Sequence, residues 1–160
     1  MRTLLRMFVI GAVLAIGTAG VVLAATAPDP AVGTWKLNLE KSKFNPGPAF
    51  KSQSRTYAQT SDGLKLTFSG VAADGSAVSG ESTFKYDGKD YPISGSPDYD
   101  TLTLKRVSSH TIKSTQKKDG KAVGTTTRTV SKDGMVMTLA SKGKGASGAA
   151  FHNTLVFDKQ

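Results

Sequence analysis

The sequence contains no cysteine among its 160 residues. A chain without cysteine forms no disulfide, offers no thiolate to a metal and carries no thiol nucleophile or lipid-anchoring cysteine. Histidine is scarce as well, with only His110 and His152. Neither histidine has a carboxylate near it in the sequence, and no nucleophile–base pair or metal-ligand set is recognisable. The sequence therefore predicts a non-enzymatic protein without catalytic residues, a metal or another cofactor.

The region after the first 25 residues also lacks a sustained apolar period of 3.6 residues, which argues against helices. Asp-Gly pairs, the strongest short hairpin signal, divide it at 62–63, 74–75, 87–88, 119–120 and 133–134. The longest step between them contains two more turn candidates, at 94–97 and 108–110. One strand with a tight turn takes about 8–12 residues in an all-β chain. The spacing therefore predicts a meander of antiparallel hairpins.

Alternating side chains predict nine or ten strands, at about 32–39, 53–59, 64–70, 78–86, 89–93, 101–107, 111–117, 121–131, 135–141 and 151–157. Pro92 weakens the fifth of these or places it at an edge. Clean alternation gives a sheet one apolar and one wet side, and closure removes its exposed edges. We expect a single all-β domain over 28–160, an up-and-down barrel of eight to ten strands. An open two-sheet sandwich is the alternative.

The chain begins with a basic and then an apolar segment. Arg2 and Arg6 precede an almost wholly apolar stretch over 7–22, and small residues from Ala24 to Ala27 offer cleavage sites. This order is typical of a secretory signal peptide over 1–25. It predicts a periplasmic or secreted protein with no stable membrane span after cleavage. The alternative is an uncleaved anchor, because about 18 apolar residues can span a bilayer.

Acidic residues are few compared with basic ones. The chain has 12 Asp and Glu against 21 Lys and Arg, a net charge of +9, and removing Arg2 and Arg6 leaves 19 basic residues and +7. The lysines are scattered beside turns rather than clustered on one element, which argues against a nucleic-acid partner. Anionic envelope surfaces suit such a diffuse basic surface better, and simple solubility explains it equally well.

Arg55, Arg106 and Arg128 are the only arginines after the leader, and all three fall on the apolar phase of their expected strands. The lysines in these regular runs fall on the opposite phase. The inward phases contain no Asp or Glu, and a buried ion without a partner costs several kcal/mol. The arginines would therefore meet water, aromatic faces, backbone carbonyls or an anionic guest. The pattern predicts a cavity prepared for an anion.

A small amphiphile with a carboxylate head fits this arrangement. We expect Arg55, Tyr57 and Arg106 to contact its head, with charge-assisted hydrogen bonds from the guanidinium groups. The apolar tail would lie along Leu66, Phe68, Phe84, Leu104, Met137 and Leu139. Many other inward positions are small, which favours empty volume. The alternative is that the arginines lie solvated or stacked at the ends of a barrel that is filled by its own side chains.

The run Gly33-Thr34-Trp35-Lys36-Leu37 resembles the opening signature of the calycins, which include the lipocalins and the fatty-acid-binding proteins. In that family the tryptophan of a Gly-x-Trp motif plugs one end of the barrel, and in lipocalins a late arginine packs across it. The resemblance implies that Gly33, Trp35 and an arginine close this barrel, with Arg128 the best match and Arg106 second. It also implies a small secreted bacterial lipocalin-like protein. Residues 40–51 lack the helix pair of fatty-acid-binding proteins.

Two functions follow from these observations. The first is an exported binding protein for a small hydrophobic or amphipathic ligand, anionic and fatty-acid-like, held inside the barrel. The second is a non-enzymatic envelope-interaction or inhibitor module with a filled barrel. Its working surface would be its loops, chiefly 40–51, 89–100 and 141–150.

Overall fold

The computed structural model describes residues 27–47, 50–145 and 147–160, so the predicted signal peptide over 1–25 lies outside the described residues. Ten strands follow one another: β1 (Gly33–Lys43), β2 (Phe50–Thr60), β3 (Gly63–Ala72), β4 (Ala77–Phe84), β5 (Asp87–Pro92), β6 (Thr101–Arg106), β7 (Thr111–Lys118), β8 (Lys121–Val130), β9 (Val136–Lys144) and β10 (Ala150–Lys159). None of the described residues belongs to a helix long and apolar enough to cross a membrane.

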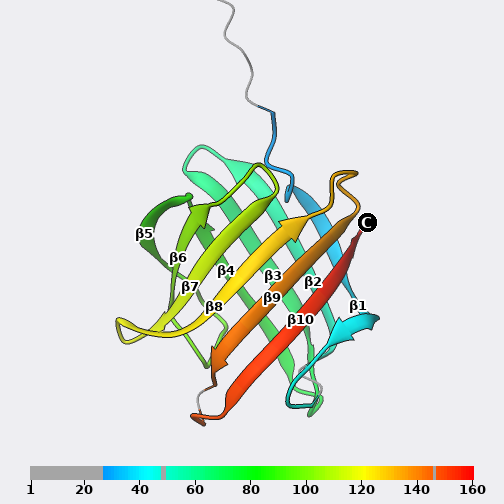
Figure 1. Ribbon diagram of the computed structural model, residues 1–160, viewed down its shortest axis with the longest axis vertical. Helices are drawn as coiled ribbons and strands as arrows, with labels where there is room; N and C mark the ends of the chain where they lie inside the picture. The colour runs from blue at the N-terminus through cyan, green and yellow to red at the C-terminus, as the bar shows by residue number, and fades with distance from the viewer. Residues whose placement is uncertain (1–26, 48–49, 146) are drawn as a thin grey trace, which may run out of the picture.

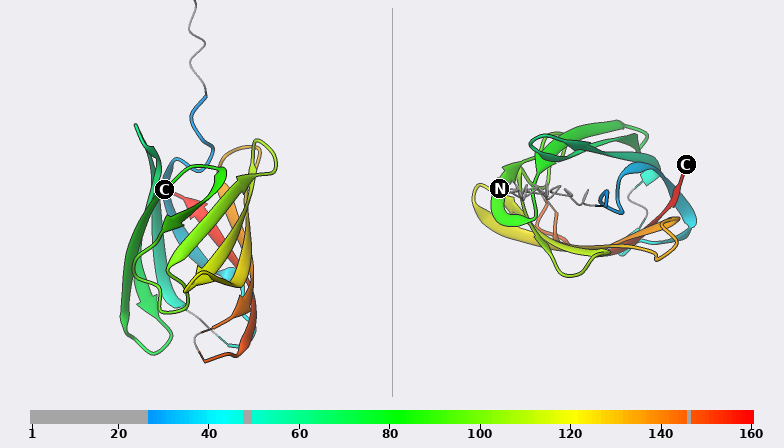
Figure 2. Two further views of the ribbon diagram at one scale, coloured as in Figure 1. Left: turned by 90° about the vertical axis from the view of Figure 1, so that its left-hand side faces the viewer. Right: turned by 90° about the horizontal axis from the view of Figure 1, so that it is seen from above.

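All ten strands join one sheet in the order β4-β3-β2-β1-β10-β9-β8-β7-β6-β5. Each pairs with its neighbours in antiparallel fashion, and the sheet curls into a flattened barrel (Figure 1, Figure 2). The predicted all-β meander barrel is confirmed, with ten strands. The connection after β1 is shorter than the predicted 40–51, because β1 continues to Lys43 and β2 begins at Phe50.

The barrel wall closes where β4 faces the chain that follows β5. There the backbone N–H of Ser94 donates to the Glu81 carbonyl at 3.0 Å, and the Ser82 hydroxyl donates to the Pro92 carbonyl at 2.8 Å. Gly95 has φ +79°, and a Cβ on it would lie 1.8 Å from the Ser79 carbonyl oxygen. Only glycine permits this close approach. The wall is therefore continuous here without a regular strand pair.

The inward phases of the strands form the apolar core, as predicted for most positions. The largest fully buried side chains are Trp35, Phe84, Met137 and Phe157. Two large apolar residues that alternation assigns to inward phases, Leu39 and Met135, are exposed instead. Leu39 is 45% exposed, because the pairing of β1 with β10 shifts register after Asn38. Met135 is 53% exposed, because it lies in the turn before β9 rather than in the strand.

Candidate functional site: the barrel interior

One end of the barrel is closed by residues 27–32, which lie against Trp35. The Trp35 indole is fully buried and donates from Nε1 to the Ala31 carbonyl at 2.7 Å. Lys159 also contacts this tryptophan, with Nζ 5.2 Å from the centre of the Trp35 ring. Gly33 has φ +129°, and a Cβ there would lie 2.9 Å from Cε of Lys159. The Gly-x-Trp motif thus forms the closed end, but its cation is a lysine rather than the predicted arginine.

Asp29 brings a carboxylate into this closed end. Its side chain is only 7% exposed, and Oδ2 lies 2.5 Å from Nη2 of Arg106, while Oδ1 lies 3.7 Å from Nη2 of Arg128. The inward phases of the strands contain no Asp or Glu, as expected, but the segment before β1 brings this carboxylate into the interior. Two of the three inward arginines already have a counter-ion.

Arg128 lies deep in the closed end between aromatic rings. Its guanidinium carbon is 4.9 Å from the centre of the Tyr57 ring and 5.5 Å from that of Tyr86, and Nη2 donates to the Tyr86 hydroxyl. The guanidinium carbon of Arg106 lies 4.5 Å from the centre of the Tyr86 ring. Burial raises the pKa of Tyr86 to about 12, so this phenol stays protonated. Stacking of this kind stabilises a buried guanidinium.

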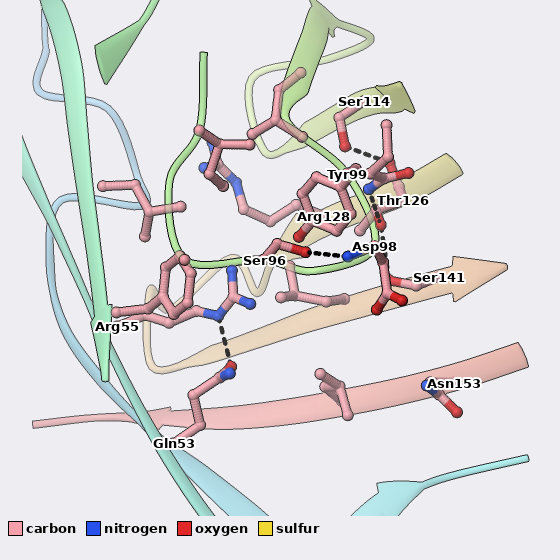
Figure 3. Close-up of a pocket in the computed structure, with 18 of the residues that line it drawn as sticks. Gln53, Arg55, Ser96, Asp98, Tyr99, Ser114, Thr126, Arg128, Ser141 and Asn153 are labelled. Atoms are coloured by element: carbon pink, nitrogen blue, oxygen red, sulfur yellow. Dashed lines mark hydrogen bonds between the residues drawn. The ribbon is translucent and has the colours of Figure 1, made fainter. Parts of the chain in front are cut away.

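A cavity of about 270 Å³ lies inside the barrel next to this cluster (Figure 3). Strands from both walls line it, together with Gly95, Ser96, Pro97, Asp98 and Tyr99 from the connection between β5 and β6. This connection crosses the end of the barrel opposite Trp35. At its start the Ser94 N–H donates to the Glu81 carbonyl on β4, and further along Asp98 lies near Gly145, just after β9. The barrel is therefore hollow rather than filled, as the small inward residues predicted.

Arg55 presents a guanidinium to this cavity. Its carbon lies 5.6 Å from the centre of the Phe68 ring and 5.5 Å from that of Phe157, and Nε donates to Gln53 Oε1 at 2.9 Å (Figure 3). None of the ion pairs within the described part of the chain involves Arg55. The partners of Arg55 are thus aromatic faces, a neutral amide and the Tyr57 hydroxyl.

Positive charge at this side of the cavity lowers the pKa of the Tyr57 phenol. Burial raises the pKa of Tyr57, but the charges of Arg55 and Arg128 and their hydrogen bonds to its oxygen outweigh burial. The pKa therefore lies below its ordinary value of 10.0. Three guanidinium groups and the carboxylate of Asp29 gather here, and Asp98 adds a second carboxylate to the lining of the cavity. An anion that enters the cavity would find an excess of positive charge.

The opposite wall of the cavity carries a polar row, defined as Ser114, Thr126, Ser141 and Asn153. These residues are direct cross-strand partners on β7, β8, β9 and β10, and all four line the cavity. Gln116 donates from Nε2 to Thr126 Oγ1 at 2.6 Å, and Thr126 Oγ1 lies 2.7 Å from Ser141 Oγ. Figure 3 shows the row across the cavity from Arg55 and Gln53.

Seven of the nine predicted ligand-binding residues line the cavity: Arg55, Tyr57, Leu66, Phe68, Phe84, Leu104 and Leu139. Their contacts with a ligand stay a prediction. Met137 is fully buried in the core and does not line the cavity. Arg106 lies at the rim of the closed end, exposed and paired with Asp29, and does not line the cavity either. The predicted Arg128, assigned to barrel closure, lines the cavity as well.

The sequence patterns do not point to Asp29, Gln53 or the polar row. Alternation alone places Ser114 and Thr126 on inward phases, but only as small residues that leave space. Their shared register could not be read before the strands were aligned with one another. Asp29 lies between two prolines outside any alternating pattern, so no periodicity marked it.

The histidines lie apart from this site. His110 follows Ser109 in the turn between β6 and β7, and His152 is exposed on β10. Within residues 27–47, 50–145 and 147–160, no group of three or more His, Asp and Glu side chains could hold a metal ion.

Comparison with known proteins identifies no family. No family model matches the sequence, and no curated protein matches it. Among solved structures, zebrafish ileal bile acid-binding protein complexed with cholic acid is similar, with a TM-score of 0.47, 11% identity, and coverage of 82% of this chain and 99% of that one. A redesigned β-barrel, mFAP1, bound to DFHBI, has a TM-score of 0.39 and 15% identity over 81% of this chain and 95% of that one. At such low similarity, the ligand of neither protein defines one for this chain.

Proposed function

We propose that this protein binds a small amphipathic anion inside its barrel, outside the cytoplasm, and that Arg55 binds the anionic head. The observation that carries this proposal is a hollow interior into which Arg55 points without a counter-ion among the described ion pairs. A guanidinium removed from bulk water gains most from a carboxylate, which it can hold by two parallel hydrogen bonds. The export expected from the leader gives the location.

The closed-end cluster supports Arg55, rather than Arg106 or Arg128, as the head-group residue. Asp29 already balances those two arginines, and a guest carboxylate there would have to displace it. At Arg55 a guest meets a neutral amide and two phenyl rings. Its tail would lie against Leu66, Phe84, Leu104 and Leu139, which line the same cavity.

Titration calorimetry with decanoate and decanol, which differ mainly in charge, tests the proposal. Hydrogen bonds to charged groups contribute about 1.5–3 kcal/mol, so Arg55→Met should weaken decanoate binding by about 10- to 100-fold. Decanol affinity should change by less than about threefold, because the methionine keeps the apolar stem. Lys36→Met is the matched control, since Lys36 is an exposed cation on the outside of β1.

Two results would contradict the proposal. One is wild-type protein that binds neither compound and shows a clean unliganded mass in native mass spectrometry. The other is an Arg55→Met protein with unchanged decanoate affinity.

A further inference from the structure

We infer that the polar row binds an oxygen atom of the guest, so that the ligand is an oxygenated anionic amphiphile, such as a keto or hydroxy acid, rather than a plain fatty acid. This inference rests on the proposed function, because the row and Arg55 face the same cavity. It adds a second point of recognition, on the wall across from Arg55 (Figure 3).

Proton counting gives the first reason. Gln116 Nε2 can only donate, so Thr126 Oγ1 accepts its hydrogen bond. Thr126 and Ser141 then share one hydrogen bond, although each hydroxyl carries one proton. Whichever of the two donates to the other, one proton of the pair remains, and no described residue accepts it. The pair therefore offers one hydrogen-bond donor at the cavity wall.

Asn153 gives the second reason. Its Oδ1 accepts from the backbone N–H of Asn45 at 3.0 Å, and this contact fixes the amide orientation. Its Nδ2 then carries two protons, and none of the described hydrogen bonds uses them. Asn153 is the direct cross-strand partner of Ser141. Two neighbouring donors on one wall suit a single acceptor oxygen.

The chemistry of the guest follows from these donors. Inside a barrel they are solvated when the cavity holds water. A hydrocarbon tail against the row would displace this water without replacing its hydrogen bonds, which costs affinity. A keto or hydroxyl oxygen replaces them. The cavity thus selects a molecule with an anionic head at Arg55 and an oxygen where it reaches the row.

The test compares decanoate with oxodecanoates that carry a keto group at carbon 5, 7 or 9, because a keto oxygen can only accept. At about 1 kcal/mol per net hydrogen bond, the wild type should bind at least one oxodecanoate about fivefold tighter than decanoate. Asn153→Leu removes both amide donors and should reduce this preference to less than about twofold, whereas Ser141→Ala leaves the Thr126 proton as a donor and should change it less. The matched control is Thr138→Val with Thr154→Val, which changes the neighbouring outward residues on β9 and β10 and should keep the preference.

The outcomes separate this inference from the proposed function. If the wild type binds decanoate but prefers no oxodecanoate, or if the row variant keeps the preference, the inference is overturned and Arg55 binding stands. If no carboxylate binds, both are overturned. Trp35 fluorescence on urea unfolding verifies that each variant folds. Asn153→Ala serves where Asn153→Leu does not fold, and should at least halve the preference.

Discussion

The substitution Asp29→Asn tests whether the segment before β1 fixes the closed end of the barrel. Asparagine keeps the shape of the side chain and an oxygen that can still accept from the Ala31 N–H, which Asp29 Oδ1 does at 2.9 Å. It removes the negative charge and replaces Oδ2, which accepts from Arg106, by an NH2 group that only donates. Any loss of stability therefore measures the role of the Asp29 carboxylate toward Arg106 and Arg128.

The magnitude follows from the burial of the two arginines. The Arg128 side chain is 8% exposed, and removing one partner of a buried ion pair typically costs about 3–5 kcal/mol. Arg106 is 39% exposed and can turn to water, so its share is that of a surface pair, about 0–1 kcal/mol. The 3.7 Å contact with Arg128 is longer than an ideal pair. We expect a loss of about 2–4 kcal/mol, or roughly 5–15 °C in Tm.

Equilibrium unfolding in urea, followed by the fluorescence of the single tryptophan, measures this loss directly. Trp35 lies beside the Asp29 segment through its bond to Ala31, so its signal reports the closed end. Glu81→Gln is the matched control, because it breaks only the exposed pair with Lys65 and should cost less than about 1 kcal/mol. A loss below about 1 kcal/mol for Asp29→Asn, with an unchanged m-value, would refute the reasoning.

Two further predictions concern the same end of the barrel. Burial raises the pKa of Asp29, but hydrogen bonds from the Ala31 N–H and from Arg106 and the charge of Arg128 lower it by more, so the pKa lies below its ordinary value of 3.8. A depressed pKa gives stability that is present above the unfolded value, about 3.9, and is lost as the pH falls through the folded value. The gap in unfolding free energy between wild type and Asp29→Asn should therefore close below about pH 4 in acid titrations, and a constant gap would contradict this. Trp35→Ala should cost about 3–5 kcal/mol by circular dichroism, because a fully buried indole is removed, and a loss under about 1 kcal/mol would show that Trp35 does not hold the barrel closed.

The strands and their turns could be predicted because they depend on local chemistry. An Asp-Gly pair needs only its own backbone freedom to form a turn, and all five such glycines have positive φ. Alternation then assigned Arg55, Tyr57 and Arg128 to the interior, and all three line the cavity. Turn chemistry and side-chain period therefore carry much of the information about this fold.

The candidate site was harder to predict, because it depends on which strands meet. Arg106 shares the inward phase of β6, but it is the last residue of that strand, so it reaches the rim instead of the cavity. Lys159 lies over Trp35 in the place expected for an arginine, because β1 pairs with β10 in a register that brings Trp35 beside Lys159. Alternation within one strand contains neither kind of information.

The way the wall closes has a consequence for association between molecules. Strands β4 and β5 are the two ends of the ladder, and an end strand with free N–H and C=O groups is a template for pairing with another chain. Here the Ser94 segment takes the place beside β4 that a foreign strand would need. The same segment thus blocks the addition of a strand from another molecule at β4, and the cavity inside the barrel remains.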